Sequence, residues 1–172
     1  MPNCANSIAS SFLIDCLDSN GGVKEIKVKA FDSALTGHSV SSGVDTLSGA
    51  ALTGWYLFEA AQETSIATSD GATDRATGTT VHTQTITYIN NKLKASFRNT
   101  LNSMCGMFVH VAVLDNNDNV WLFGYQRGCI VSASSSTTGT AFTDRNGYSV
   151  TFTGREKNTM LSVSNAWSAL AT

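Results

Sequence analysis

The order of apolar and polar positions along the chain predicts a series of short β-strands. After the turn signal Asp-Ser-Asn-Gly-Gly at 18–22, apolar residues alternate with lysines from Ile26 onward. This period of two is typical of a half-buried strand. β-Branched and aromatic residues, which favour strands, mark further segments at 54–69, 81–89, 107–115, 120–125 and 144–156. The pattern therefore indicates a mainly β protein.

The last of these segments assigns its residues to faces. An Asn146-Gly147 turn leads into a strand whose apolar face carries Tyr148, Val150 and Phe152. The intervening residues Ser149, Thr151 and Thr153 form a polar face. We expect the first set to face a core and the second to face away from it.

One segment follows the helical period instead. Apolar residues recur every four positions and then three further on, at Ile89, Leu93, Phe97, Leu101 and Met104, with polar residues between them. This spacing predicts an amphipathic α-helix over about 90–104. Gly106 lies where a glycine commonly ends a helix.

The segment 120–125 carries bulk on both faces of its predicted strand, with Val120, Trp121, Leu122, Phe123 and Tyr125 following a crowded Asp/Asn turn. A small soluble domain usually leaves one face of such a strand in water, so something must cover the second face. Two covers are open: the apolar stripe of the predicted helix, or an adjacent subunit. Trp121, Phe123 and Tyr125 are therefore candidate subunit-contact residues.

Three segments lack a clear period. The Ser/Gly-rich stretch 32–53 fits a loop or a pair of short strands, and 70–80 fits a hairpin tip. The apolar tail 159–172 fits a helical stripe or an extended arm, docked through Trp167 on its own domain or on a neighbour. Trp167 is thus a fourth candidate contact residue. The length of 172 residues and the lack of a repeat predict a single domain over 1–172.

Composition argues for buried uncharged surface and against nucleic-acid recognition. Apolar residues make up 42% of the chain and charged residues 14%, whereas about a quarter is usual for charged residues. Large uncharged surfaces are often buried against other subunits. The net charge is −2 and the lysines and arginines are scattered, so the basic cluster that nucleic-acid binding needs is missing.

Candidate chemistry is sparse. The four cysteines form no Cys-x-x-Cys pair, and the three histidines do not stand beside them at ligand spacing. The Asp115–Asn119 stretch lacks the glycine and glutamate of a calcium loop. No Gly-x-Ser-x-Gly elbow is present. We therefore expect no enzyme activity, no cofactor and no metal site, and reduced cysteines.

Targeting signals are not evident either. The first residues lack a basic start followed by an apolar run, as a signal peptide would have. No stretch approaches the roughly 20 apolar residues that span a bilayer. We expect the protein to assemble in a cytoplasm and not to insert into a membrane.

The order of several stretches resembles the tail tube (major tail) proteins of tailed bacteriophages. These stretches are "IASSFLIDCLDSNGGVKEIKV", "TQTITYINNKL", "VAVLDNNDNVWLFG" and "GTAFTDRNGYSVTFTGREKN", which together extend from about 8 to 158. The resemblance implies a β-sandwich or rolled β-barrel flanked by one helix. Six copies would form a ring, and stacked rings would form the tube through which DNA passes.

The same resemblance implies a place and partners. The protein would lie in the virion tail after assembly in a bacterial host, and would contact itself, a tape-measure protein and other tail proteins. The segments 32–53 and 70–80 would be the candidates for contacts between stacked rings.

Two other functions fit the pattern less well. One is another phage structural part, such as a tail terminator, a head–tail connector or a capsid decoration protein. The other is a carbohydrate-binding β-sandwich module, in which Trp55, Tyr56 and Trp121 would be stacking platforms.

Overall fold

The computed structural model describes residues 19–32, 35, 38–41 and 44–172. Within them lie eleven strands, one α-helix and two short 3₁₀ turns. In chain order these are β1 (Val23–Ala30), β2 (His38–Ser41), β3 (Val44–Leu47), η1 (Gly49–Leu52), β4 (Tyr56–Glu59), β5 (Ile66–Asp74), β6 (Thr79–Asn90), α1 (Ala95–Met104), β7 (Phe108–Asp115), β8 (Val120–Phe123), β9 (Cys129–Thr137), β10 (Gly147–Glu156), β11 (Leu161–Val163) and η2 (Trp167–Ala169). The predicted mainly β class with one flanking helix is confirmed.

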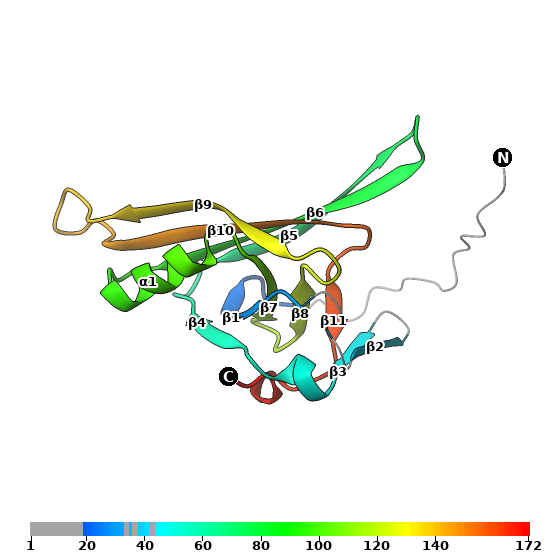
Figure 1. Cartoon of the computed structure of the whole chain (residues 1–172). Coiled ribbons are helices and arrows are strands. Elements are labelled where there is room, and N and C mark those ends of the chain that lie inside the picture. Colours follow the sequence, from blue (N-terminus) through cyan, green and yellow to red (C-terminus); the bar gives the residue numbers. More distant parts are fainter. Residues whose placement is uncertain (1–18, 33–34, 36–37, 42–43) are drawn as a thin grey trace.

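All strands belong to one open sheet that folds into two layers (Figure 1). We name them the outer layer, with the order β5-β6-β10-β9, and the buried layer, with the order β4-β1-β7-β8-β11-β3-β2. Pairing within the outer layer is antiparallel throughout. A short pairing of β7 with β9, at Phe108 with Ile130 and Val109 with Cys129, joins the two layers.

The chain passes between the layers at a glycine-bounded bulge, residues 124–128. β8 and β9 both pair with β7, and the five residues between them loop away. Two buried polar side chains hold this loop: Gln84 accepts a hydrogen bond from Gly124 N at 2.8 Å, and Glu156 accepts bonds from the next turn at 2.7 and 2.9 Å. Gly124 has φ +66, and a Cβ there would lie 2.7 Å from Cys129 N, so the corner requires glycine.

The first core lies between the two layers and beneath α1. Its buried residues are Val23, Ile26, Val28, Phe58, Ile86, Tyr88, Leu101, Met104, Val109, Val111, Val113, Phe123, Cys129, Tyr148, Val150 and Phe152. Tyr148, Val150 and Phe152 are among them, whereas Thr151 faces away and is half-buried. The face assignment predicted for this strand is confirmed.

A second core covers the other face of the buried layer. It contains Leu35, Leu47, Ala51, Trp55, Ala112, Leu114, Val120, Leu122, Val163 and Leu170. Phe123 therefore points into the first core, while Val120 and Leu122 point into the second. The predicted cover by the helix is found on the Phe123 side, because Leu101 and Met104 of α1 belong to the same core. The opposite face is covered by β11, η1 and the end of the same chain, and contact with a neighbouring subunit stays a prediction.

The helix is shorter than predicted at its N-terminal end. α1 begins at Ala95 because residues 89 and 90 continue β6 as partners of β10. Phe97 anchors it among aromatic rings, with centroids 5.7 Å from Phe58, 5.9 Å from Tyr88 and 5.0 Å from Tyr148. Gly106 follows the helix with φ +88, as its predicted role at the helix end requires.

The three segments without a clear period take different places. The described part of 32–53 contains the antiparallel β2–β3 hairpin and η1, which lie over the second core. Residues 33–34, 36–37 and 42–43 of that segment lie outside the described residues. Segment 70–80 is the tip of the β5–β6 hairpin.

The segment 159–172 lies against its own subunit and does not project as an arm. β11 pairs with β8 and β3, and Trp55 N donates a 3.0 Å bond to the carbonyl of Ala171. Lys27 reaches from β1 to the carbonyls of Trp167 and Leu170 at 2.8 and 2.7 Å.

Candidate assembly surface

The outward face of the outer layer is a sheet of hydroxyl side chains. Residues paired across an antiparallel ladder share a face, and the register aligns Thr68, Thr85 and Thr153 in one row. Thr87 and Thr151 form the next row. The hydroxyl residues of this face are Thr68, Thr79, Thr83, Thr85, Thr87, Ser132, Ser135, Thr137, Ser149, Thr151 and Thr153. In Figure 1 no described helix or strand lies over this face.

Charges on this face are few. Asp70 and Arg155 both align with Thr83, so they lie in one row near the hairpin end of the layer. Asp74 lies further along the same face at the hairpin tip. The other positions present mainly hydroxyl and methyl groups, with Ile66, Ile89 and Ile130 among them. Such a face offers hydrogen bonds to water but little electrostatic attraction to a polyanion.

Both edges of the outer layer are open. β5 pairs with β6 over nine residues and with no second strand in the described part of the chain. β9 pairs with β7 only at its first two residues, so 131–137 has β10 on one side and no described strand on the other. The unpaired N–H and C=O groups of such edges are templates for pairing with another chain.

Exposed aliphatic side chains lie on the β5 edge and next to the open part of the β9 edge. Ile66 on β5 is 58% exposed, and Ile130 on β9 is 41% exposed. Beside Ile130 lies Phe108, which is 54% exposed and tilted against Phe31 at a centroid distance of 6.1 Å. These residues would leave water if the two edges met.

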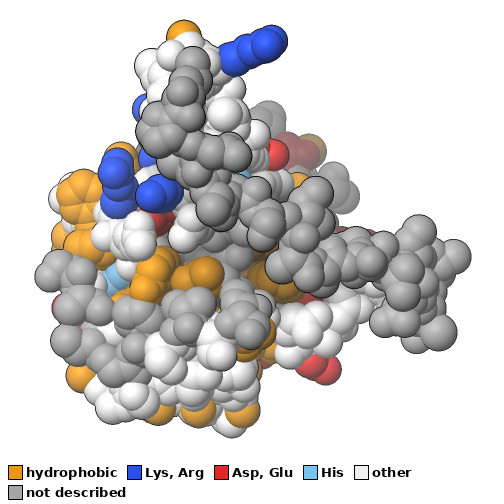
Figure 2. Space-filling model, turned by 90° about the vertical axis from the view of Figure 1, so that its right-hand side faces the viewer, with side chains coloured by type: hydrophobic (Ala, Val, Ile, Leu, Met, Phe, Trp, Pro, Cys, Tyr) orange, Lys and Arg blue, Asp and Glu red, His pale blue; other side chains and the backbone are white. Residues whose placement is uncertain are grey.

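The β5–β6 hairpin extends beyond the body of the molecule (Figure 1). Its turn is held by Asp74, which accepts bonds from Ala76 N at 2.8 Å and Thr77 Oγ1 at 3.0 Å. These bonds, with that from Ala76 the strongest cause, lower the pKa of Asp74. Figure 2 views the molecule from this side, where the projecting part is mostly neither charged nor apolar. The tip is an ordered projection available for contact.

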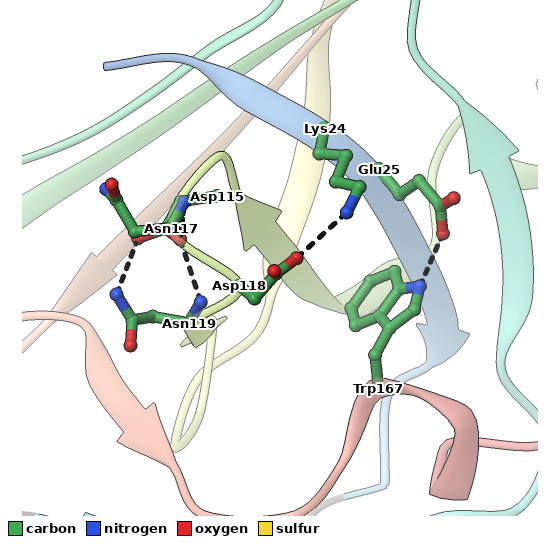
Figure 3. Close-up of polar contacts among 7 residues, drawn as sticks. All are labelled: Lys24, Glu25, Asp115, Asn117, Asp118, Asn119 and Trp167. Carbon is green, nitrogen blue, oxygen red and sulfur yellow. Dashed lines mark hydrogen bonds and ion pairs between the residues drawn. The ribbon is translucent and has the colours of Figure 1, made fainter. Parts of the chain in front are cut away.

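The four predicted contact residues all pack within their own subunit. Phe123 is fully buried. Trp121 is half-buried and donates a 2.9 Å bond to Asp115, and Tyr125 packs against the second core. Trp167 stacks under Lys27, with Nζ 4.5 Å from the ring centroid, and donates its indole N–H to Glu25 (Figure 3). Their proposed contact with a neighbouring copy stays a prediction, and Phe123 offers no exposed surface for it.

None of the four predicted contact residues lies on the open edges or on the hydroxyl face. Part of the signal was present, since the Thr-x-Thr spacing at 83–87 and 149–153 marks a polar face. Which strands end up at an edge depends on pairing partners far away in the chain, and no local pattern contains that information.

The aromatic side chains considered as carbohydrate-stacking platforms mostly make contacts within the subunit. Trp55 is 1% exposed and donates a 2.8 Å bond to the carbonyl of Ala51. Trp121 is bonded to Asp115 as described. Tyr56 is 60% exposed on the edge strand β4, so these three do not form one exposed platform.

The titratable residues of the described chain form no metal-binding group of three or more. His110 is fully buried, with Nδ1 2.7 Å from the carbonyl of Gly124 and Nε2 accepting from Asp32 N at 3.1 Å. Burial lowers its pKa, which keeps the ring neutral as a structural bridge.

The two described cysteines differ in exposure. Cys129 is buried beside the bulge, and burial raises its pKa to about 12. Cys105 is exposed at the end of α1. Cys4 and Cys16 lie outside the described residues.

Among the described residues, no helix is long and apolar enough to cross a membrane. No family model matches the sequence, and neither a curated protein nor a solved structure gives a significant match.

Proposed function

We propose that the chain is the subunit of a closed ring, and that stacked rings form the tail tube of a bacteriophage. The observation that carries the proposal is the pair of open edges at opposite sides of one layer. In the ring, β9 of each copy pairs with β5 of the next copy. The contact is head to tail, and the rotation between neighbours closes it.

The strand directions suit this pairing. Three successive antiparallel pairings make β5 and β9 run in opposite directions. When copies are placed side by side in the same orientation, β9 of one and β5 of the next therefore meet antiparallel. The outer layers then form one continuous antiparallel sheet, with every ladder of the usual kind.

The composition of the edges also supports the proposal. Natural edge strands are usually protected by lysine, proline, strong bulges or very short length. The open part of β9 reads Val-Ser-Ala-Ser-Ser-Ser-Thr and contains neither lysine nor proline. Its one irregularity is a register shift against β10 at Ser132, which leaves 133–137 as a regular open edge. β5 carries acids only in its distal half, at Asp70 and Asp74. A subunit that kept such edges exposed would tend to aggregate.

The hydroxyl face would line the inside of the closed sheet. With six copies, as the resemblance implies, four strands from each give a cylinder of 24 strands, wide enough for an open channel by comparison with barrels of about 16–22 strands. A lining with few cations would let DNA pass without holding it. The first core and the buried layer then form the outer wall.

The test is electron microscopy of concentrated purified protein together with proline variants on the β9 edge. In an antiparallel strand, backbone N–H groups point alternately to the two sides, so one of Ser134→Pro and Ser135→Pro spares the bonds to β10. That variant should remain folded by circular dichroism and form no rings. The control is Asn99→Lys, at an exposed position of α1. A proline at that position would break the helix and cannot serve as the control. Wild-type protein that stays monomeric at high concentration would contradict the proposal.

The projecting hairpin is the candidate for contact between rings. Replacing 71–82 with Asn-Gly would keep the pairing of Asp70 with Thr83 and close it with a favoured two-residue turn. The shortened protein should form rings but not tubes, as counted on micrographs. Tubes of normal length would remove the hairpin from the stacking contact.

Another phage structural protein with the same ring-forming layer, such as a tail terminator, is the second candidate. It shares the open edges and differs in the absence of stacking. Single rings from wild-type protein at every concentration would favour it.

A further inference from the structure

An apolar pocket opens between the two layers near the start of β5. Its volume is about 220 Å³. Its apolar walls come from Val23, Ile66, Ala67, Trp121, Phe123 and Met160. An apolar cavity of about 150 Å³ is large enough to bind benzene, so this pocket has room for a phenyl ring.

An exposed phenyl ring lies on the loop between β9 and β10. Phe142 is fully exposed, with a relative exposure of 107%, so it packs against none of the described residues of its own subunit. The loop lies at one end of the outer layer, beyond α1 (Figure 1). Moving an exposed phenyl ring from water into an apolar site of its size is favourable.

The loop is braced so that Phe142 stands at its apex. Asp144 accepts bonds from Thr140 N at 2.8 Å and Ala141 N at 2.7 Å. Asp144 N in turn donates to the carbonyl of Ala141 at 3.0 Å, which closes a β-turn around Phe142 and Thr143. A side chain on a rigid turn loses less conformational entropy when it binds.

The pocket wall carries one acid, and the loop carries one cation that can face it. The charged residue on the pocket wall is Asp115. Burial would raise its pKa, but hydrogen bonds from Trp121 and Asn119 outweigh burial and lower it, so it is ionised at neutral pH. On the loop, Asp144 is directed towards the backbone of its own turn, and Arg145 makes no ion pair within the described chain, so the Arg145 guanidinium is the charge that can face Asp115.

We propose that Phe142 of one copy inserts into this pocket of a second copy. The contact rests on the proposed function in one respect: a single phenyl ring binds weakly, so it acts between copies that the sheet edges have already brought together. It adds a side-chain lock to a contact otherwise made by backbone groups. In the assembled protein the pocket is then filled and Arg145 lies near Asp115.

The direct experiment is photo-crosslinking in the full-length protein. Phe142 is replaced with p-benzoylphenylalanine, and the variant is mixed with isotope-labelled wild-type chain and assembled. Crosslinked peptides between unlabelled and labelled chains should map to the pocket residues near 66–67, 121 or 160. Crosslinks from position 142 that stay within one chain or fall on other surfaces of the second copy would overturn the proposal.

Substitutions give the energetic test. Phe142→Ala should raise the concentration needed for assembly roughly 10- to 100-fold, from the usual value of burying a phenylalanine. The neighbouring Thr143→Ala is the matched control and should leave that concentration unchanged. Ala67→Leu, which fills the pocket from within, should reproduce the loss while the thermal melt stays at or above that of the wild type. An unchanged assembly concentration for Phe142→Ala would refute the lock.

The outcomes separate the lock from the ring. Rings without pocket crosslinks leave the proposed function standing and remove the lock. Pocket crosslinks between copies in protein that forms no rings keep the lock and remove the ring.

Discussion

The buried layer and the outer layer are built from the same kinds of strand and end in opposite situations. β7, at the centre of the buried layer, is buried at every position from Val109 to Leu114, with one core on each side. β10, in the outer layer, alternates buried residues with half-buried hydroxyl residues. The centre of the buried layer has both faces covered, whereas the outer layer keeps a free face and two free edges.

This difference indicates where the subunit can take part in assembly. The second core is completed by the same chain, through η1, β11 and the docked segment around Leu170. Assembly is therefore not needed to finish the hydrophobic interior. Among the described strands, backbone pairing remains incomplete along β5 and β9 of the outer layer and along β4 and β2 at the ends of the buried layer. The outer-layer edges lie on opposite sides of one layer, so we expect assembly to act mainly through them.

Substitutions on the two faces of β10 should differ most in their effect on the free energy of unfolding. Phe152→Ala should destabilise the fold by about 3–5 kcal/mol, because it leaves a cavity in the first core. Thr151→Ala, one residue away on the hydroxyl face, should change the free energy of unfolding by no more than about 0.5 kcal/mol. Urea titration of the dissociated subunit measures both. Equal losses would mean that the hydroxyl face is covered by something within the subunit.

The next effect concerns the docked end of the chain. Lys27→Met keeps the aliphatic stem but removes the ammonium that bonds the carbonyls of Trp167 and Leu170. We expect a loss of about 1–3 kcal/mol for the unpaired buried carbonyls and faster amide exchange over 161–172. Lys24→Met removes only an exposed ion pair with Asp118 and should leave exchange in that segment unchanged. Unchanged exchange in Lys27→Met would show that the second core alone holds the segment.

A smaller effect should appear with pH. Because burial lowers the folded-state pKa of His110 below its usual 6.5, the unfolded state takes up the proton more readily. The contribution of the neutral ring is therefore complete above about pH 6.5 and declines as pH falls towards the folded pKa. Denaturant midpoints at pH 7.5 and 5.5 should differ less in His110→Gln than in the wild type. An identical pH dependence in both proteins would contradict this assignment.

The smallest effect is chemical and leaves the fold intact. In native protein, iodoacetamide should alkylate Cys105 and spare Cys129, whose buried thiol has a pKa of about 12. Peptide mapping measures the modified fraction at each site. In urea both should react, and equal labelling in native protein would mean that the bulge beside Cys129 opens readily.

Part of the fold could be predicted because its signals are local. Alternation placed Tyr148, Val150 and Phe152 on the core side, and four-residue spacing located α1. The helix start was misplaced because Ile89 fits the helical spacing and also lies in a strand. Its neighbour Tyr88 is buried in the core and Ile89 pairs with Ser149, so sheet pairing decided its state.

Local sequence patterns account for the positions of strands, turns and the helix and for their apolar faces, since both depend on residues a few positions apart. The choice of neighbouring strands emerges only when the whole chain folds. The tertiary structure closed the second face of β8 with the distant end of the same chain and left β5 and β9 without a second partner. The physical reason is that hydrogen-bond pairing between strands depends on backbone groups that every residue carries, so residue identity alone does not specify the partner.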